Sequence, residues 1–578
     1  MNQNTWVNGL NIGTLLTALT ALAAIFISPH TMAQVAADKI IVSQNVITMT
    51  QEHGELAQAK AIAISGERIV WIGDAQDMAA WQNSETKIID HGKNAILPGF
   101  IDAHGHVSFS ALASTLANVA SPPVGPVDTM ADLQSTLSAY IESNQIPAGE
   151  WVVGMGYDDS LISERRHPNR DDLDNVSTLH PIMLIHVSGH LIAANSKALA
   201  RGGINAETPN PAGGIIRRRV GSQEPDGVLE ETATYSLRQY MTAPNTDPLS
   251  SVLAALENYA SYGITTAQDG AASPEVVALI QAAAQQHKLP LDVIVYPLGQ
   301  GDTDTITGAY EWGGYNNRVK IGGIKLVLDG SPQGKTAFLS KPYHVAPAGQ
   351  DESYRGYPTI DALATNTLVA NYLANNIPII AHANGDAAAQ MLIEAVAQAA
   401  PESDHRTVMI HAQTVREDQL TRMKSLNMIP SYFSAHTFYW GDWHRDSVLG
   451  EARGMRISPT ASTQQRGMIF TVHNDAPIVP PDMIRLLWAT TNRLTRSGKV
   501  LGPEQRISVY EALKAMTIYA AYQQFEEQDK GTIEIGKLAD FVVLSANPLQ
   551  LAPTQILQLK VRATYSRGKN IFTAAATD

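Results

Sequence analysis

The sequence predicts an α/β protein: a (β/α)8 TIM barrel with a β-sandwich domain built from both termini and a large insertion after barrel strand 1. Three observations support this. Eight short apolar runs each end in a polar or metal-competent residue, helical patterns such as 387–399 and 417–426 follow several of them, and strand-like runs occur at both chain ends. The eight runs are 97–106, 263–269, 291–298, 323–329, 377–386, 407–413, 428–436 and 468–475.

The strand-like runs at the two chain ends are separated by Gly and polar turns, as in a small antiparallel sheet. They predict a β-sandwich domain from 34–96 and 529–578, which flanks a barrel domain spanning 97–528. The runs are 39–50, 60–65 and 67–72 on the N-terminal side, and 531–535, 540–544 and 561–566 on the C-terminal side.

A long connection, 107–262, separates the first two barrel runs. Because structureless loops of this length are rare inside compact domains, the segment is expected to be a folded insertion. Its own strand-like runs at 151–157 and 181–187 agree with that expectation.

The composition is that of a folded, acidic protein. Of 578 residues, 44% are hydrophobic, and 41 Lys and Arg against 55 Asp and Glu give a net charge of -14. Negative charge disfavours nucleic acid as a partner, so we expect a small-molecule substrate; the oligomeric state, a homo-oligomer included, stays open. The chain has no cysteine, which excludes disulfides and thiolate nucleophiles and leaves His, carboxylate or modified Lys as metal ligands.

The N-terminus predicts a signal peptide at 1–33. An uncharged start leads into an apolar run at 13–27, followed by small residues, with cleavage expected after Ala33 or, alternatively, Ala37. The run is short for a bilayer span, although an uncleaved membrane anchor is the alternative. We therefore expect a periplasmic or secreted protein with no membrane association after signal cleavage.

A metal site is predicted at the carboxyl rim of the barrel. His104 and His106 end the first run, and residues two apart on an extended segment point to the same side. His382, His411 and Asp475 end the fifth, sixth and eighth runs, where barrel enzymes carry their catalytic groups. The pair alone would be a weak signal, but the joint pattern is specific.

Lys325 lies within the fourth run, among apolar residues where a free ammonium is costly to bury. One interpretation is a buried ion pair with Asp329. The other is that CO2 adds to the neutral amine and forms a carbamate whose oxygens bridge two divalent ions. Zinc is the default for imidazole and carboxylate ligands, but manganese, iron or nickel could occupy such a site.

The ordered motifs resemble the amidohydrolase superfamily, and most closely amidohydrolase family 3 with its N-substituted formamide deformylase-like enzymes. The resemblance spans nearly the whole mature chain and implies a metal-bearing barrel with a β-sandwich. It also implies His104, His106, carboxylated Lys325, His382, His411 and Asp475 as ligands. The matching stretches are 97–106, 189–190 with 195–196, 323–330, 381–387, 410–413, 474–477 and 536–540.

The leading hypothesis is an exported metal-dependent amidohydrolase acting on an amide-type C–N bond, such as that of an N-formyl or N-acyl compound. A metal-bridged hydroxide would attack the carbonyl, with Asp475 as general base and acid. The alternatives are a deaminase, which would release ammonia, a cyclic amidase, which would retain the nitrogen, and a non-catalytic binding or regulatory protein. The presence of all six ligand positions disfavours the last.

Three further residues are expected to bind substrate. His436 ends the seventh run at the same rim, while the resemblance lets His190 reach over the barrel mouth from the insertion. Tyr157 precedes an acidic pair in the insertion. Each has a plain structural role as its alternative. His473, which shares a strand face with Asp475, is interpreted as a core residue or a support for the ligands.

Overall fold

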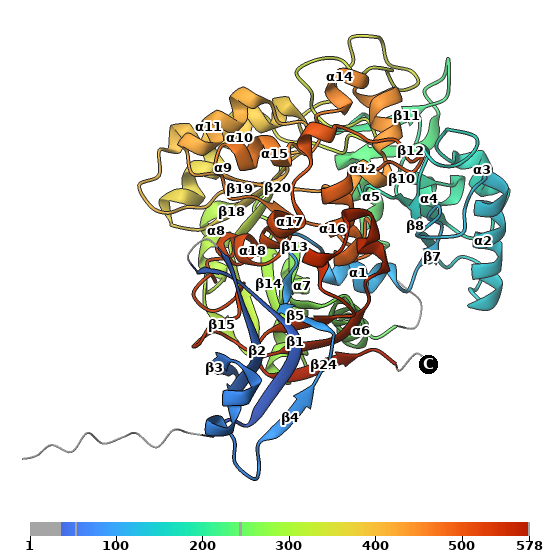
Figure 1. The fold of residues 1–578 in the computed structure, drawn as a ribbon. Coiled ribbons are helices and arrows are strands. Elements are labelled where there is room, and N and C mark those ends of the chain that lie inside the picture. Colours follow the sequence, from blue (N-terminus) through green and yellow to red (C-terminus); the bar gives the residue numbers. More distant parts are fainter. Residues whose placement is uncertain (1–35, 53–54, 242–245, 576–578) are drawn as a thin grey trace, which may run out of the picture.

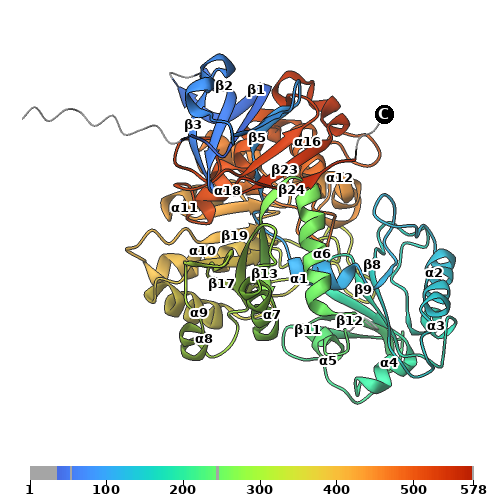
Figure 2. The same ribbon diagram turned by 90° about the horizontal axis from the view of Figure 1, so that it is seen from below.

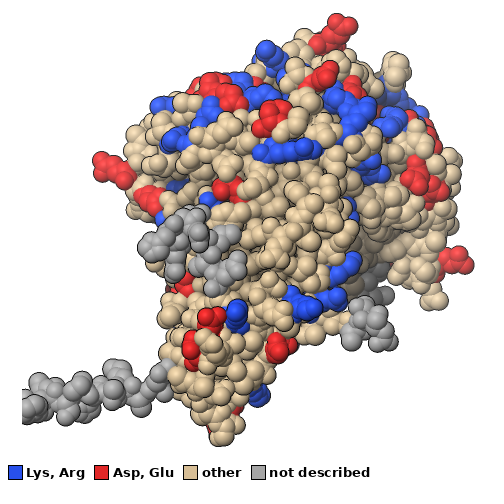
Figure 3. All heavy atoms as spheres, viewed as in Figure 1, with Lys and Arg blue, Asp and Glu red and all other residues tan. Residues whose placement is uncertain are grey.

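The computed structural model describes residues 36–52, 55–241 and 246–575, so the predicted signal peptide, 1–33, lies outside the described residues. The described strands form four sheets, of eight, six, five and five strands (Figure 1). Among the described helices, none is long and apolar enough to cross a membrane. On the face shown in Figure 3, Lys and Arg side chains are interspersed with Asp and Glu over the described surface.

Strands from both termini form one mixed eight-stranded sheet, with the N-terminal strands beside the C-terminal ones (Figure 2). The sequence predicted a sandwich, whereas the described strands of the two termini pair into a single sheet. The segment 531–535 is not a strand, because its Ile533 donates one backbone hydrogen bond to Thr48 and no ladder follows. The strands, in spatial order, are β24 (Lys569–Thr573), β23 (Val561–Ser566), β22 (Phe541–Leu544), β5 (Ala95–Pro98), β1 (Lys39–Glu52), β2 (Glu55–Ser65) and β3 (Arg68–Gly73), with β4 (Lys87–Asp90) on β1.

All eight apolar runs contain a strand, and these strands lie in the two five-stranded sheets. The first run is divided at Gly99, where a side chain would collide with Thr265. Before it, β5 pairs with β1 and β22 of the terminal sheet; after it, β6 pairs with β13 of the parallel one. The eight are β6 (Phe100–Ile101), β13 (Ile264–Ala272), β14 (Asp292–Pro297), β17 (Ile324–Val327), β18 (Ile379–Ala383), β19 (Val408–His411), β20 (Ile429–Tyr432) and β21 (Thr471–Val472).

The two five-stranded sheets are neighbours in one parallel arrangement. β16 (Val319–Ile321) pairs in parallel with β14, and after two glycines the chain continues as β17, which pairs in parallel with β18. The short β15 (Tyr315–Asn316) is antiparallel to β16. Beyond the outer strands, Asp475 donates a backbone hydrogen bond to His104, and His106 donates one to Ala476. The carboxyl ends of β6 and β21 therefore lie together.

Helices alternate with the parallel strands, as predicted; 387–399 and 417–426 correspond to α10 and α11. α7 starts with a Ser273 cap followed by proline, a strong helix-start signal. β18 is buried on both faces, which explains why such strands read as unbroken apolar runs. The main helices are α7 (Pro274–Gln285), α8 (Thr303–Ala309), α9 (Ala362–Ala374), α10 (Asp386–Ala399), α11 (Glu417–Ser425), α15 (Thr460–Gln465), α16 (Met483–Asn492), α17 (Val509–Met516) and α18 (Ile518–Gln523).

The insertion is folded around its own six-stranded sheet, and the runs predicted at 151–157 and 181–187 are the strands β8 and β9. Leu133 and Leu137 of α2 are fully buried in an apolar cluster with Leu184 of β9. The strands are β11 (Gly214–Arg218), β12 (Pro225–Glu231), β10 (Leu191–Ala194), β9 (Ile182–His186), β8 (Val152–Tyr157) and β7 (Ala117–Asn118), in spatial order. The helices are α1 (Val107–Ala113), α2 (Met130–Ser143), α3 (Arg170–Asp174), α4 (Ser196–Arg201), α5 (Tyr235–Arg238) and α6 (Pro248–Ser261).

A buried charge cluster ties the terminal sheet to the parallel strands. Asp292 on β14 is fully buried, and its carboxylate lies 2.9 Å from the Lys530 ammonium, 3.0 Å from the Arg567 guanidinium and 3.3 Å from that of Arg318. Burial alone would raise the pKa of Asp292, but the three cations hold it below its usual range. The carboxylate therefore contributes stability above the unfolded-state pKa of about 4, and this contribution is lost as pH falls through the folded-state pKa.

We expect Asp292→Asn to lower the free energy of unfolding by about 3 kcal/mol at pH 7, since it removes the buried carboxylate that three cations share. Lys530 then keeps Glu526 and Arg567 keeps Glu67, whereas Arg318 loses its counter-charge. Urea unfolding would measure this, and the gap between wild type and variant should narrow below about pH 4. Glu67→Gln is the control, because Glu67 pairs with Arg567 at the surface and should cost less than about 1 kcal/mol. Equal effects of the two substitutions would contradict the role given to Asp292.

Candidate metal centre

The six predicted ligands line one cavity of about 540 Å³ at the carboxyl ends of the parallel strands. Two of them follow β6, one follows β21, and the others lie on β17, β18 and β19. Their convergence depends on the parallel order, which places the ends of all these strands at one edge. The six are His104, His106, Lys325, His382, His411 and Asp475.

The carboxylate of Asp475 lies close to three of the histidines. Its Oδ1 lies 3.1 Å from Nε2 of His106 and 3.5 Å from Nε2 of His104, and its Oδ2 lies 3.9 Å from Nε2 of His411. Burial alone would raise the pKa of Asp475, but the three imidazoles hold it well below its usual range. The contacts to Oδ1 are close but poorly aligned, so among the described residues this buried oxygen has no hydrogen-bond partner.

Two of these residues have left-handed backbone conformations, with φ of 72° at His411 and 57° at Asp475. Residues with a side chain seldom adopt such angles, and they persist where the surrounding structure holds them. Here the turn at the end of each strand aims the side chain into the cavity.

Hydrogen bonds on the outer side of the rings determine which nitrogens face the centre. The Gln268 amide donates to the carbonyl of Ala103, so its oxygen, 2.6 Å from Nδ1 of His104, accepts the proton on that nitrogen. The carbonyl oxygen of Gly330, 3.1 Å from Nε2 of His382, does the same for that ring. His104 Nε2 and His382 Nδ1 therefore carry lone pairs, as metal-binding imidazoles require.

His411 completes the arrangement. Its Nδ1 lies 3.3 Å from Nε2 of His473, and Nδ1 of His473 lies 2.9 Å from Oγ of Ser431. His473 therefore helps to orient the ring of His411, as one of its two predicted roles. Nε2 of His411 lies 3.0 Å from Nδ1 of His382. Burial is the first cause that lowers the pKa of both rings well below the usual range, so both are neutral. Converging neutral imidazoles and an unpartnered carboxylate oxygen fit divalent cations.

Lys325 is buried, and its Nζ lies 2.8 Å from Nε2 of His104. Burial lowers the pKa of Lys325 to about 7, although Asp475 opposes the shift. The alternative ion pair with Asp329 is not formed, because that carboxylate accepts backbone hydrogen bonds from Phe338, Asn384 and Gly385. A large fraction of the amine is therefore neutral near pH 7, which is the form that reacts with CO2.

Of the three predicted substrate-binding residues, one lines the cavity and two do not. His190 lies in the cavity wall, with its ring 4.9 Å from that of His382. His436 is outside the cavity lining: it is buried against Phe433, and its Nδ1 lies 2.9 Å from Nε2 of His444. Tyr157 is also outside the cavity lining; it is fully buried in the insertion, and its hydroxyl lies 3.3 Å from Nδ1 of His167.

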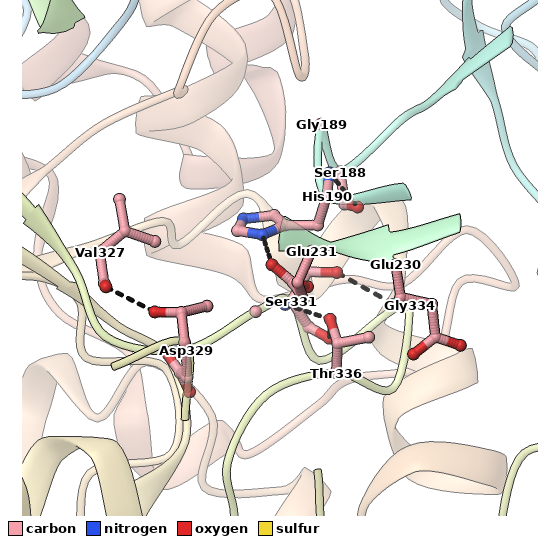
Figure 4. Close-up of polar contacts among 12 residues, drawn as sticks. Ser188, Gly189, His190, Glu230, Glu231, Val327, Asp329, Ser331, Gly334 and Thr336 are labelled. Atoms are coloured by element: carbon pink, nitrogen blue, oxygen red, sulfur yellow. Dashed lines mark hydrogen bonds and ion pairs between the residues drawn. The ribbon is translucent and has the colours of Figure 1, made fainter. Parts of the chain in front are cut away.

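Two site residues were not predicted from the sequence. Gln268 on β13 orients His104, and Glu231 at the end of β12 is hydrogen-bonded to His190, as Figure 4 shows. Neither belongs to a recognisable motif, because each acts through a contact with a residue far away in the chain. A polar residue inside an apolar strand, as at Gln268, is the weak signal that could have been used.

The model of the amidohydrolase family matches residues 87–572. The chain is 27% identical over 554 residues to N-substituted formamide deformylase of Arthrobacter pascens, covering 92% of this chain and 97% of that protein. Two solved structures of uncharacterized metal-dependent hydrolases share the fold. The one from Pyrococcus horikoshii has a TM-score of 0.69 and 21% identity, and covers 89% of this chain and 99% of its own. The one from Pyrococcus furiosus has a TM-score of 0.66 and 23% identity, and covers 89% and 100%.

We expect Gln268→Leu to weaken zinc binding by about 10- to 100-fold, because His104 loses the acceptor that fixes its tautomer. Chelator competition on the purified protein would measure the affinity, and thermal unfolding would show whether the variant is folded. His287→Asn, which changes an exposed histidine in a left-handed turn, should leave zinc affinity unchanged. A folded Gln268→Leu protein with unaltered affinity would refute the role of Gln268.

Proposed function

Because the chain belongs to the amidohydrolase family, we propose that it hydrolyses the C–N bond of a small-molecule amide in the cavity lined by the six predicted ligands. The observation that carries the proposal is the convergence of inward-facing imidazole nitrogens on a buried carboxylate oxygen that has no hydrogen-bond partner among the described residues. The similarity to a protein named N-substituted formamide deformylase, over nearly the full length of both chains, favours an N-formyl or related N-acyl group.

In this proposal two divalent ions, zinc by default, are held by the six ligands, with Lys325 as its carbamate. Such ions polarise a carbonyl group and lower the pKa of water toward neutrality. The neutral imidazoles need lose no proton to bind them, and the lowered pKa of Lys325 favours carbamate formation. The carbamate would also replace a cation that repels the ions by an anion that attracts them.

Asp475 is the proposed proton carrier. Its carboxylate accepts the proton that the attacking water loses and gives it to the nitrogen as the C–N bond breaks, so water and amide become a carboxylic acid and an amine. Asp475 lines the cavity together with the other five candidate ligands, so its carboxylate is close to where water and substrate would meet.

The remaining sequence-based expectations belong to the same proposal. The eight parallel strands would close into one barrel, as the hydrogen bonds between the segments after β6 and β21 favour. The apolar run at 13–27 favours export to the periplasm or the medium after removal of 1–33.

Asp475→Asn should reduce kcat for an N-acyl amine by about 10²- to 10⁴-fold, because it removes the proton carrier. Steady-state kinetics with release of free amine would show the loss, while metal analysis should find most of the metal retained. Asp418→Asn, at an exposed carboxylate paired with Arg416, is the matched control. Wild-type turnover in Asp475→Asn would exclude the proposed proton transfer.

Lys325→Ala, prepared with bicarbonate beside wild type, should lower the metal content from about two ions per chain, as in bridged two-metal sites. Elemental analysis measures this directly, and Lys288→Ala, at an exposed lysine, should keep the wild-type content. If Lys325→Ala retained both ions, the bridging carbamate would be ruled out; if even wild type held no tightly bound metal, the hydrolase mechanism would fail.

A further inference from the structure

Glu231, at the end of β12, is a buried carboxylate that the proposed chemistry does not use. It is 4% exposed, and its backbone has φ of 49° and ψ of −120°, a conformation rarely adopted by a residue with a side chain. Oε2 lies 2.7 Å from Nδ1 of His190 (Figure 4), while the buried Oε1 has no hydrogen-bond partner within the described chain. Strain and an unpartnered buried oxygen together indicate a function.

The position of Glu231 depends on Gly330. A Cβ atom at residue 330 would lie only 2.1 Å from Oε1 of Glu231, so only glycine permits this approach. The carbonyl oxygen of Gly330 lies 3.1 Å from Nε2 of His382, one of the predicted ligands. Glu231 thus connects the insertion to the strand ends that carry the metal centre.

His190 is also held from its backbone side. Its amide donates a hydrogen bond to Oγ of Ser188 at 3.2 Å. Ser188 Oγ lies 2.8 Å from Nδ1 of His186, whose Nε2 lies 3.0 Å from the Asp159 carboxylate. The chain of buried polar groups behind Ser188 and the carboxylate of Glu231 together fix both the backbone and the ring of His190.

This support determines the tautomer. A carboxylate has no proton to donate, so Nδ1 of His190 carries a proton, and in the singly protonated ring Nε2 carries a lone pair. Nε2 makes no hydrogen bond to any described residue, although the ring lines the cavity beside His382. A bound molecule with an N–H group would supply the missing donor.

We propose that Nε2 of His190 accepts the hydrogen bond of the scissile amide N–H, with Glu231 as the positioning residue, so that the enzyme selects secondary amides over esters and tertiary amides. The inference rests on the proposed amide hydrolysis and specifies its substrate class. Esters and tertiary amides have a carbonyl group but no N–H, so they would leave this acceptor in the cavity wall without a donor from the substrate. A site built around one substrate hydrogen bond rejects analogues that lack it.

The test compares N-hexylformamide with hexyl formate. The two compounds differ only in that the ester has an oxygen atom where the amide has its N–H group. The ratio of kcat/KM for amide and ester is measured in zinc-loaded wild type, His190→Phe, Glu231→Met and Glu231→Gln. We expect the ratio to fall by about 10-fold or more in His190→Phe and Glu231→Met, with the ester rate nearly unchanged. Glu231→Gln retains an acceptor for Nδ1 and should keep the wild-type ratio.

A general loss of structure would reduce both rates together, so the ratio separates positioning from folding, and metal content is measured for each variant. Nitrogen-15 NMR of histidine-labelled metal-free protein, with His190 assigned by its absence from His190→Phe, should show the proton on Nδ1. An unchanged ratio in folded His190→Phe, or a proton on Nε2, overturns the inference while amide hydrolysis stands. If wild type cleaves neither compound, the proposed function on formamides fails, and this inference fails with it.

Discussion

The metal centre depends on the cost of burying polar groups that have no partner. In one cavity, inward-facing imidazole nitrogens surround the Asp475 carboxylate, whose buried Oδ1 has no hydrogen-bond partner among the described residues, and a buried polar group without a partner is costly. Divalent cations remove that cost, because they attract lone pairs and the carboxylate at once. The residues behind the histidine rings contact the ring nitrogens that face away from the centre. Gln268 contacts His104, the carbonyl of Gly330 contacts His382, and His473 contacts His411.

The strand arrangement fixes the positions of the candidate ligands. His104 and His106 directly follow β6, which continues from β5 of the terminal sheet through Gly99. The terminal sheet is also joined to β14 by the cations around Asp292. The sheet built from the chain ends thus anchors the first two ligands, although it contributes no side chain to the cavity.

Metal binding and substrate recognition are divided between different parts of the chain. The six candidate ligands lie on or just after the parallel strands, whereas the insertion supplies His190 and Glu231, and the His190 ring lies beside that of His382. Segments outside the repeated strand–helix pattern can change without disturbing the ligands, which is how one scaffold serves many substrates. The strained backbone of Glu231 and the close approach of Gly330 show that here the insertion is fitted closely to the centre.

The strands and the family could be predicted from local sequence patterns. Parallel strands buried on both faces read as unbroken apolar runs, so all eight could be found. The six candidate ligands were predicted from their positions in these runs and from the family resemblance, and they line one cavity. Family membership and metal-dependent hydrolysis were predicted from the same motifs and are confirmed. Local patterns carry this information because backbone conformation and burial are largely local properties.

Tertiary structure alone decided which polar groups share a cavity. His436 was expected at the rim and Tyr157 in the insertion beside an acidic pair, yet both side chains are buried and neither lines the cavity. Glu231 has no local signal, since its role arises from contacts with His190 and Gly330 across sequence distance. Side-chain environment is set by how distant elements pack, and no local pattern encodes that packing.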